Sequence, residues 1–375
     1  MIQRFLFDKI CDSDQEGKAI VILGSRQVGK TTLLGELSAR FGDYLVLNGD
    51  EPDIRELLHQ INSDRLKSIF AGKSLIIIDE AQMIPDIGLT LKLITDRIGG
   101  IKLYVSGSSS LELANSINEP LTGRKFEFKM HPISLGEMIK HHGLIKEKRL
   151  LLHRMIFGYY PEVVSSFGKE IILLKELVTS YLYRDILSFG LIKKPVVLDK
   201  LLRALALQVG SEVSYNELSR TLGVDKETVE KYIDLLEKAF IIYRLHALSR
   251  NVRNEIKKGK KIYFWDNGIR NALIGNFLPW ENRTDQGALW ENFIVGERMK
   301  HNSYSDHYGH FYFWRSSQQQ EIDFIEEKDG TFIAFEFKVN SRKVAKLPTT
   351  FSKAYPVSSY KIISPDNVEE ILYNA

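Results

Sequence analysis

Cysteine is almost absent from this chain of 375 residues, which contains only Cys11. One cysteine excludes a disulfide within the chain. No CxxC or HxxxH-type spacing of zinc ligands appears in the sequence. Long apolar runs are also lacking, since none approaches the ~18 residues of a membrane-spanning helix. Charged side chains at Arg4 and Asp8 interrupt the first residues before the core of a signal peptide could form. We therefore expect a cytoplasmic protein in a reducing compartment, with no membrane partner.

A large excess of charge of one sign is lacking as well, because the formal net charge is only +3. The charge is nevertheless uneven, since residues 250–261 contain six basic side chains and one acidic one. Such a local concentration favours an anionic partner, and we predict DNA. The candidate nucleic-acid contacts are Arg250, Arg253, Lys257, Lys258, Lys260 and Lys261.

A strand, a turn bounded by glycines and a helix follow one another near the N-terminus. The apolar residues 19–23 predict a buried strand, and the apolar spacing after Thr32 predicts a helix. Between them, residues 24–31 match the GxxxxGK[ST] phosphate-binding loop, in which backbone N–H groups surround a polyphosphate. The lysine of this motif reaches the β- and γ-phosphates and assists catalysis, while the threonine hydroxyl binds Mg²⁺. The candidate nucleotide-binding residues are Gly24, Ser25, Arg26, Gln27, Val28, Gly29, Lys30, Thr31 and Thr32.

A second acidic motif follows an aliphatic run about fifty residues later. Residues 75–78 are all aliphatic and are followed by Asp79 and Glu80. This is the Walker B pattern, with its carboxylates at the end of a parallel strand where open α/β sheets bind ligands. We predict that Asp79 holds Mg²⁺ and that Glu80 orients or polarises the attacking water. Together the two motifs predict Mg²⁺-dependent hydrolysis of a nucleoside triphosphate.

Two further residues are candidates for the same site. Ser108 follows the predicted strand 102–105, where a polar side chain would lie beside the γ-phosphate, although a serine here can equally cap a helix. Arg124 precedes the alternating segment 125–129. It is a candidate arginine finger, acting within the subunit or across to a neighbouring copy, and a salt-bridge partner is the alternative.

The order and spacing of these motifs resemble a family of prokaryotic AAA+-like ATPases. The matching segments are 24–31, 76–82, 105–109 and 121–124, with connecting segments at 131–137, 158–161 and 181–186. The resemblance implies an AAA+-type α/β core with a helical lid, followed by a winged helix and a carboxy-terminal module of obscure function. The resemblance also implies ATP rather than GTP and the arginine-finger role of Arg124. The preference for ATP rests on the resemblance alone, since no residue pattern in the chain distinguishes the two nucleotides.

Composition and length agree with a chain of several packed domains. Hydrophobic residues at 44% and charged residues at 26% are globular values, and a chain of this length predicts about two to four domains. We predict an ATPase core at 1–135, a helical lid at 136–192, a winged-helix domain at 193–266 and a restriction-endonuclease-like α/β domain at 267–375. Within the third of these, residues 214–236 have the capping residues and glycine turn of a helix–turn–helix. The winged helix would bind DNA through its basic wing, or serve as a spacer between protein parts.

The last part of the chain contains a second set of chemically suggestive residues. Glu291 lies on a predicted amphipathic helix, Asp323 on a predicted strand, and Glu336 and Lys338 on one face of the next strand. This arrangement resembles the PD-(D/E)XK nuclease core. In that chemistry Asp323 and Glu336 bind Mg²⁺, Glu291 supports the site and Lys338 positions or activates the attacking water. The alternatives are a fold of this type used only for binding, or a solvated strand face.

Two functional hypotheses follow from these patterns. The first is an ATP-hydrolysing, DNA-associated protein whose carboxy-terminal domain cuts DNA, with ATP and Mg²⁺ as cofactors. The second is an ATP-gated switch or scaffold whose winged helix and inactive carboxy-terminal domain bind a protein partner. A second copy of the chain is a further candidate partner in either case.

Overall fold

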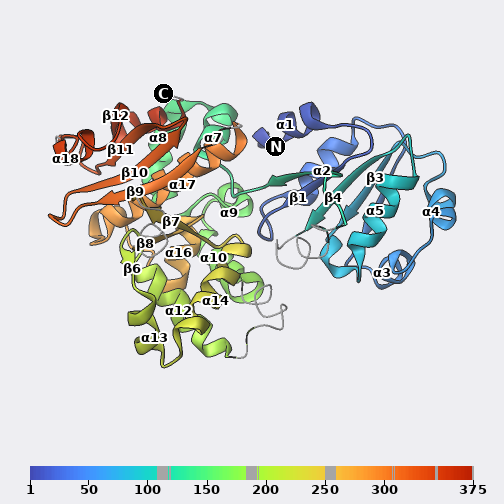
Figure 1. Ribbon diagram of the computed structural model, residues 1–375, viewed down its shortest axis with the longest axis horizontal. Coiled ribbons are helices and arrows are strands. Elements are labelled where there is room, and N and C mark those ends of the chain that lie inside the picture. Colours follow the sequence, from blue (N-terminus) through green and yellow to red (C-terminus); the bar gives the residue numbers. More distant parts are fainter. Residues whose placement is uncertain are drawn as a thin grey trace. The chain divides into compact units, whose positions relative to one another are not determined.

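The computed structural model describes residues 1–107, 117, 120–182, 192, 194–249, 259–305, 307, 309–342 and 345–373. Within this part, the chain divides into two compact units (Figure 1). The first consists mainly of residues 1–131, and the second mainly of residues 132–180, 192–237 and 241–375. No helix among the described residues is both long enough and apolar enough to cross a membrane.

The first unit is built on a five-stranded sheet of order β2-β3-β4-β1-β5. Its strands are β1 (Ala19–Leu23), β2 (Tyr44–Asn48), β3 (Leu75–Asp79), β4 (Lys102–Gly107) and β5 (Lys125–Lys129). All neighbouring pairs are parallel. Every residue of β1 and β3 is buried, as expected for strands covered on both faces. Because the strands are parallel, the residues after β1, β3 and β4 meet at one edge of the sheet.

Helices precede and connect the strands of the first unit, and several of them begin at a recognisable start signal. Helix α2 follows the phosphate-binding loop, and α3 has a proline in its first turn. The Asn62 side chain caps α4 by accepting from the Arg65 N–H at 2.9 Å. The elements are α1 (Phe5–Ser13), α2 (Lys30–Ser38), α3 (Pro52–Leu58), α4 (Ser63–Phe70), the 3₁₀ turn η1 (Ala81–Met83) and α5 (Ile87–Arg97).

The second unit begins with helices and ends with an α/β part. Its helices up to the sheet are α7 (Leu135–His142), α8 (Leu144–Phe157), α9 (Pro161–Ser165), α10 (Glu170–Glu176), the π-helical η2 (Leu177–Leu182), α12 (Pro195–Leu207), α13 (Tyr215–Leu222) and α14 (Lys226–Lys238). The later helices are α16 (Asn267–Ile274), η3 (Trp280–Asn282), α17 (Gln286–Tyr304), α18 (Thr349–Ser352) and η4 (Pro365–Leu372). The two helices predicted within residues 214–236 are therefore present as α13 and α14.

One seven-stranded sheet of order β12-β11-β10-β9-β7-β8-β6 runs through the second unit (Figure 1). Its strands are β6 (Glu212–Val213), β7 (Ile242–Ala247), β8 (Lys260–Phe264), β9 (His310–Arg315), β10 (Glu321–Lys328), β11 (Thr331–Phe337) and β12 (Val357–Ile363). Strand β7 pairs with β8 on one side and with β9 on the other. Strands from both sides of the predicted boundary at residue 266 thus share a sheet, and the predicted domain limits stay predictions.

Helix α17 is held against this sheet by a fully buried ion pair. Arg298 of α17 donates from Nη2 to Oε2 of Glu326 on β10 at 2.7 Å, and neither side chain is exposed. Asn302, one turn further along, donates to the same carboxylate at 2.7 Å. The pair fixes the face that α17 turns to the sheet, and so determines where Glu291, near its other end, is placed.

Candidate functional site

The phosphate-binding loop connects β1 to α2, as the sequence predicts. Gly29 adopts a left-handed conformation with φ +98° immediately before α2 begins at Lys30. A Cβ at Gly24 would lie 2.3 Å from the Met130 carbonyl oxygen, so that position has room only for glycine. The Lys30 ammonium donates to the carbonyls of Gly24 and Ser25, each at 2.9 Å. The Lys30 side chain therefore lies across the loop, at the place where a bound phosphate would lie.

The Walker B carboxylate meets the end of the phosphate-binding loop. The Thr31 hydroxyl donates to Asp79 Oδ2 at 2.7 Å, joining α2 to the end of β3. The backbone N–H of Glu80 donates to Asp79 Oδ1 at 3.1 Å. Glu80 itself has the left-handed φ of 48°, uncommon for a residue with a side chain, and its carboxylate accepts from the Gln82 amide. Thr31, Asp79 and Glu80, predicted separately, converge at one edge of the sheet.

The structure adds one residue to this site that the sequence analysis missed. Ser106 is fully buried at the end of β4, and its hydroxyl donates to Asp79 Oδ1. A polar residue ending an aliphatic strand was the available signal, but the prediction went to Ser108 instead. Ser108 lies outside the described residues. Ser106 lies where it orients the carboxylate of Asp79.

Arg124 is engaged within its own unit. Its Nε donates to Asp96 Oδ1 at 2.5 Å, and its side chain is 39% exposed. A second donor, Nη1, reaches the Thr122 carbonyl at 3.2 Å. This is the salt-bridge alternative considered for the residue, and its arginine-finger role stays a prediction.

The side chains at this edge fit a hydrated Mg²⁺ ion. A hydroxyl and a carboxylate oxygen already lie 2.7 Å apart at Thr31 and Asp79. Mg²⁺ binds one or two protein oxygens and takes its other ligands from water and substrate phosphates. Within the described ranges no group of three or more His, Cys, Asp or Glu side chains is arranged to hold a metal ion. A Mg²⁺ ion here would take its remaining ligands from water and from the nucleotide phosphates.

The predicted nuclease residues also come together, at the sheet of the second unit. Asp323 on β10 accepts from the Phe337 backbone N–H at 2.7 Å, which ties it to β11 next to Glu336. Lys338 pairs with Glu336. Burial, followed by the negative charges of Glu291 and Glu336, raises the pKa of Asp323 well above its usual value. Burial alone would lower the pKa of Lys338, but its pairing with Glu336 raises the pKa overall.

A second lysine lies in this carboxylate cluster. Lys261 on β8 is only 2% exposed and bridges Glu291 at 2.9 Å and Glu321 at 2.6 Å. Tyr263 donates to the same Glu291 oxygen at 2.7 Å. Burial opposes the charge of Lys261, but Glu291 and Glu321 raise its pKa overall. Lys261 was predicted to contact DNA from the wing, whereas the structure buries it among carboxylates.

The rest of the predicted basic stretch is only partly described. Lys260 is half-buried, with its ammonium 5.0 Å from the centre of the Tyr215 ring. The other four candidates lie outside the described residues: Arg250, Arg253, Lys257 and Lys258. Their contact with DNA stays a prediction.

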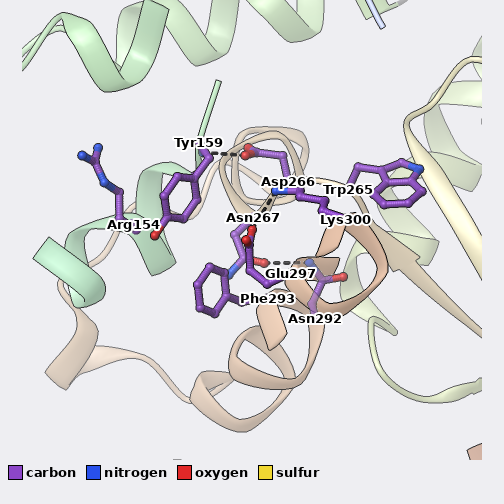
Figure 2. A pocket seen from close by; sticks show the side chains of 10 residues that line it. Arg154, Tyr159, Trp265, Asp266, Asn267, Asn292, Phe293, Glu297 and Lys300 are labelled. Atoms are coloured by element: carbon purple, nitrogen blue, oxygen red, sulfur yellow. Dashed lines mark hydrogen bonds and ion pairs between the residues drawn. The ribbon is translucent and has the colours of Figure 1, made fainter. Parts of the chain in front are cut away.

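A small polar cavity lies elsewhere in the second unit, and its charged groups are already paired. Figure 2 shows the Asp266 carboxylate facing the backbone of Tyr159, whose N–H it accepts at 2.6 Å, and Lys300 reaching Glu297 at 2.7 Å. Glu297 also accepts from the Leu135 N–H at 2.6 Å. Burial raises the pKa values of both Asp266 and Glu297. These carboxylates hold backbone segments against α16 and α17, so we interpret the residues that line the cavity as structural.

Substituting Gly158 beside this cavity is expected to destabilise the protein. Gly158 has φ +73°, and a Cβ there would lie 2.1 Å from Asp266 Oδ1. Gly158→Ala should therefore cost at least about 2 kcal/mol through backbone strain and displacement of Asp266. The melting temperature of the full chain measures this loss.

Gly168→Ala is the matched control for that measurement. Gly168 also has a positive φ, +86°, but a Cβ there meets nothing within 4 Å. Gly168→Ala introduces backbone strain but no steric clash, so it should lower the melting temperature less than Gly158→Ala does. Equal losses in the two variants would contradict the anchoring role of Asp266.

Comparisons with known proteins agree with the ATPase geometry. Residues 16–139 match the family model of an AAA domain, and residues 148–279 and 286–371 match two domains of unknown function, DUF8612 and DUF4143. An uncharacterized protein of Mycobacterium tuberculosis is 27% identical over 327 residues, covering 86% of this chain and 70% of its own. One of Haemophilus influenzae is 26% identical over 363 residues, covering 87% and 85%.

A solved structure shares the fold of much of the chain. The Walker-type ATPase paby2304 of Pyrococcus abyssi matches with a TM-score of 0.50 at 14% identity, covering 73% of this chain and 96% of its own. With the parallel sheet, the phosphate-binding loop and the AAA-domain match, this defines the core of the chain as that of a P-loop ATPase. The prediction of such a core is confirmed, and ATP binding and hydrolysis are supported as its activity.

Proposed function

We propose that this chain is a Mg²⁺-dependent ATPase whose hydrolytic site lies at the carboxyl edge of the first unit's sheet. The hydrogen bond between Thr31 and Asp79 carries this proposal. It brings the hydroxyl of the phosphate-binding loop to the Walker B carboxylate, the pair that holds the cation in P-loop enzymes. Mg²⁺ supplies neutralisation of charge on the β- and γ-phosphate oxygens.

The residues of the chain divide the remaining work between binding and hydrolysis. Lys30 exchanges its two carbonyl partners for phosphate oxygens when the polyphosphate enters the loop. Ser106 and Thr31 keep the carboxylate of Asp79 oriented. Glu80, one residue beyond the strand, accepts a hydrogen bond from the water that attacks the γ-phosphorus.

Phosphate release tests the proposal. We expect ATP hydrolysis by the full chain with Mg²⁺, and its loss with EDTA or in Lys30→Ala, because each change removes positive charge from the phosphate oxygens. Phosphate release that continues unchanged in Lys30→Ala would assign the activity to a contaminant and contradict this site. GTP in parallel reactions measures the nucleotide preference.

A second candidate function is cleavage of DNA by the carboxy-terminal part. It is favoured by the meeting of Glu291, Asp323, Glu336 and Lys338, four positions predicted from separate elements. Two carboxylates with substrate phosphate oxygens can hold one Mg²⁺ ion, and a lysine beside them can position the water that breaks the P–O bond. In this candidate function, α13, α14, β7 and β8 would act as a winged helix and would bind the DNA together with the basic stretch. Cleavage that depends on Asp323 tests this candidate.

A further inference from the structure

Arg4 connects the N-terminal segment to the phosphate-binding loop. It immediately precedes α1 and is 6% exposed. Its Nη1 donates to the Val28 carbonyl at 2.7 Å, and its Nη2 donates to the His131 carbonyl at 2.6 Å. The two acceptors lie 24 and 127 residues away along the chain. The buried guanidinium of Arg4 therefore connects the phosphate-binding loop to the segment at His131.

The first of these bonds acts on the loop's own phosphate-binding group. The Val28 carbonyl and the Gly29 N–H belong to one peptide plane, and in a trans peptide they point in opposite directions. The described residues contain no cis peptide. A donor that holds the Val28 carbonyl therefore also fixes the direction in which the Gly29 N–H points. Because glycine rotates freely, an external contact of this kind limits how far that peptide can turn.

The second bond ties the same guanidinium to the chain beside Gly24. His131 follows Met130, whose N–H donates to the Leu23 carbonyl at 2.7 Å and whose carbonyl closely faces Gly24. The planar fork of arginine carries its donor nitrogens at a fixed separation, so one guanidinium can hold two separate acceptors in a defined geometry. Arg4 thus connects the Gly29 end of the loop to the segment after β5 that lies against its Gly24 end.

The other end of α1 is anchored independently of Arg4. Asp14, just beyond the helix, accepts from the Tyr104 hydroxyl at 3.0 Å and pairs with Lys102 at 3.3 Å. Leu6 and Ile10 of α1 are buried in the core. Removing the Arg4 fork should therefore leave α1 attached to the sheet.

We propose that Arg4 is a positioning residue of the nucleotide site, which fixes the orientation of the Gly29 N–H toward the polyphosphate by holding the Val28 carbonyl. This role rests on the proposed ATPase function. Arg4 contacts no reacting atom, so it contributes to nucleotide binding more than to the chemical step. Its effect should be similar for ATP and ADP, because the amide serves the polyphosphate that both share.

Three variants of the full chain test the proposal: Arg4→Met, Arg4→Lys and Asp14→Asn. The measurements are dissociation constants for ATP and ADP by titration calorimetry, kcat and KM for ATP, and melting temperature. Because a hydrogen bond from a charged donor contributes more free energy than a neutral one, Arg4→Met should raise the dissociation constants for ATP and ADP about ten- to a hundredfold. Its KM should rise more than its kcat falls. Arg4→Lys should recover part of the affinity, because it keeps the positive charge but replaces the two donor nitrogens Nη1 and Nη2 with one.

Asp14→Asn is the matched control, since it weakens the other anchor of α1. It should lower the melting temperature while leaving both dissociation constants unchanged. Wild-type affinity in Arg4→Met, or weakened affinity in Asp14→Asn that follows its loss of stability, would reduce Arg4 to a structural role and overturn the proposal. If Arg4→Met does not fold, Arg4→Lys compared with Asp14→Asn decides in the same way. A wild-type chain that binds neither nucleotide would instead refute the proposed function.

Discussion

Replacing Glu80 with glutamine is expected to remove nearly all ATP hydrolysis while ATP binding persists. Glutamine keeps the size of the side chain but cannot accept a proton from the attacking water. General-base catalysis contributes about 10²- to 10⁴-fold to a rate, so kcat should fall by that factor. The contacts proposed for Lys30 and Thr31 with phosphate and cation do not involve Glu80, so the dissociation constant for ATP should stay close to that of the wild type.

Single-turnover phosphate release and calorimetric ATP titration separate these two effects. Glu56→Gln is the matched control, because it makes the same chemical change at an exposed carboxylate on α3 of the same unit. It should alter neither quantity. A Glu80→Gln variant that hydrolyses ATP at the wild-type rate would show that another group activates the water.

The backbone at Glu80 supports a functional assignment on independent grounds. A non-glycine residue with φ 48° costs energy, and such strain is found preferentially at functional sites. Gly49 makes the conformation possible, since a Cβ there would lie 2.3 Å from the Glu80 carbonyl oxygen. The Gly49 N–H also donates to the Asp79 carbonyl at 2.8 Å. The residue that follows β2 therefore contacts and supports the backbone turn at Glu80.

The parts of the ATPase site that the sequence predicted are those encoded by contiguous residues. Residues 19–31 and 75–80 each combine a buried strand, a turn and candidate functional side chains in one short segment, so local pattern was enough to recognise them. Their meeting followed from the rule that parallel strands bring their carboxyl ends to one edge. Ser106 was not predicted, because pattern alone could not say that this serine faces Asp79, and the prediction for Ser108 stays a prediction.

Residues whose role depends on distant backbone were not predictable in this way. Arg4 binds carbonyls far along the chain, and carbonyl acceptors leave no trace in the sequence. Lys261 looked like one more member of a basic run, because nothing local shows that β8 places it against Glu291 on α17 and Glu321 on β10. The pairing of β7 with β9 joins strands that a helix-rich segment separates, and it too has no local signal.

Replacing Asp323 with asparagine is expected to abolish DNA cleavage, if the carboxy-terminal cluster is catalytic. Asparagine can still accept the Phe337 N–H, so the strand pairing at this point should survive. It lacks the negative charge that holds a divalent cation, whose charge stabilisation is worth several kcal/mol. The cleavage rate should therefore fall by about 10³-fold, and the affinity for Mn²⁺ measured by calorimetry should fall with it.

Asp329→Asn provides the matched control for this substitution. Asp329 is exposed in the turn between β10 and β11, with a left-handed φ of 52° that asparagine also tolerates. The assay compares single- and double-stranded DNA with Mg²⁺ or Mn²⁺, with and without ATP, and measures DNA binding in the same samples. Cleavage by the wild type and by Asp329→Asn, but not by Asp323→Asn, places a nuclease centre at Asp323. Equal cleavage by all three chains contradicts it.

The wild-type result alone also separates the remaining hypotheses. DNA binding without cleavage would fit the ion pairs of the cluster. Lys261 and Lys338 neutralise the charges of Glu291 and Glu336, which favours a binding surface over a cation site. Neither binding nor cleavage would favour an ATP-gated switch whose carboxy-terminal part recognises a protein. In that case Asp323→Asn should leave ATP hydrolysis unchanged, because its site lies in the second unit and the hydrolytic residues lie in the first.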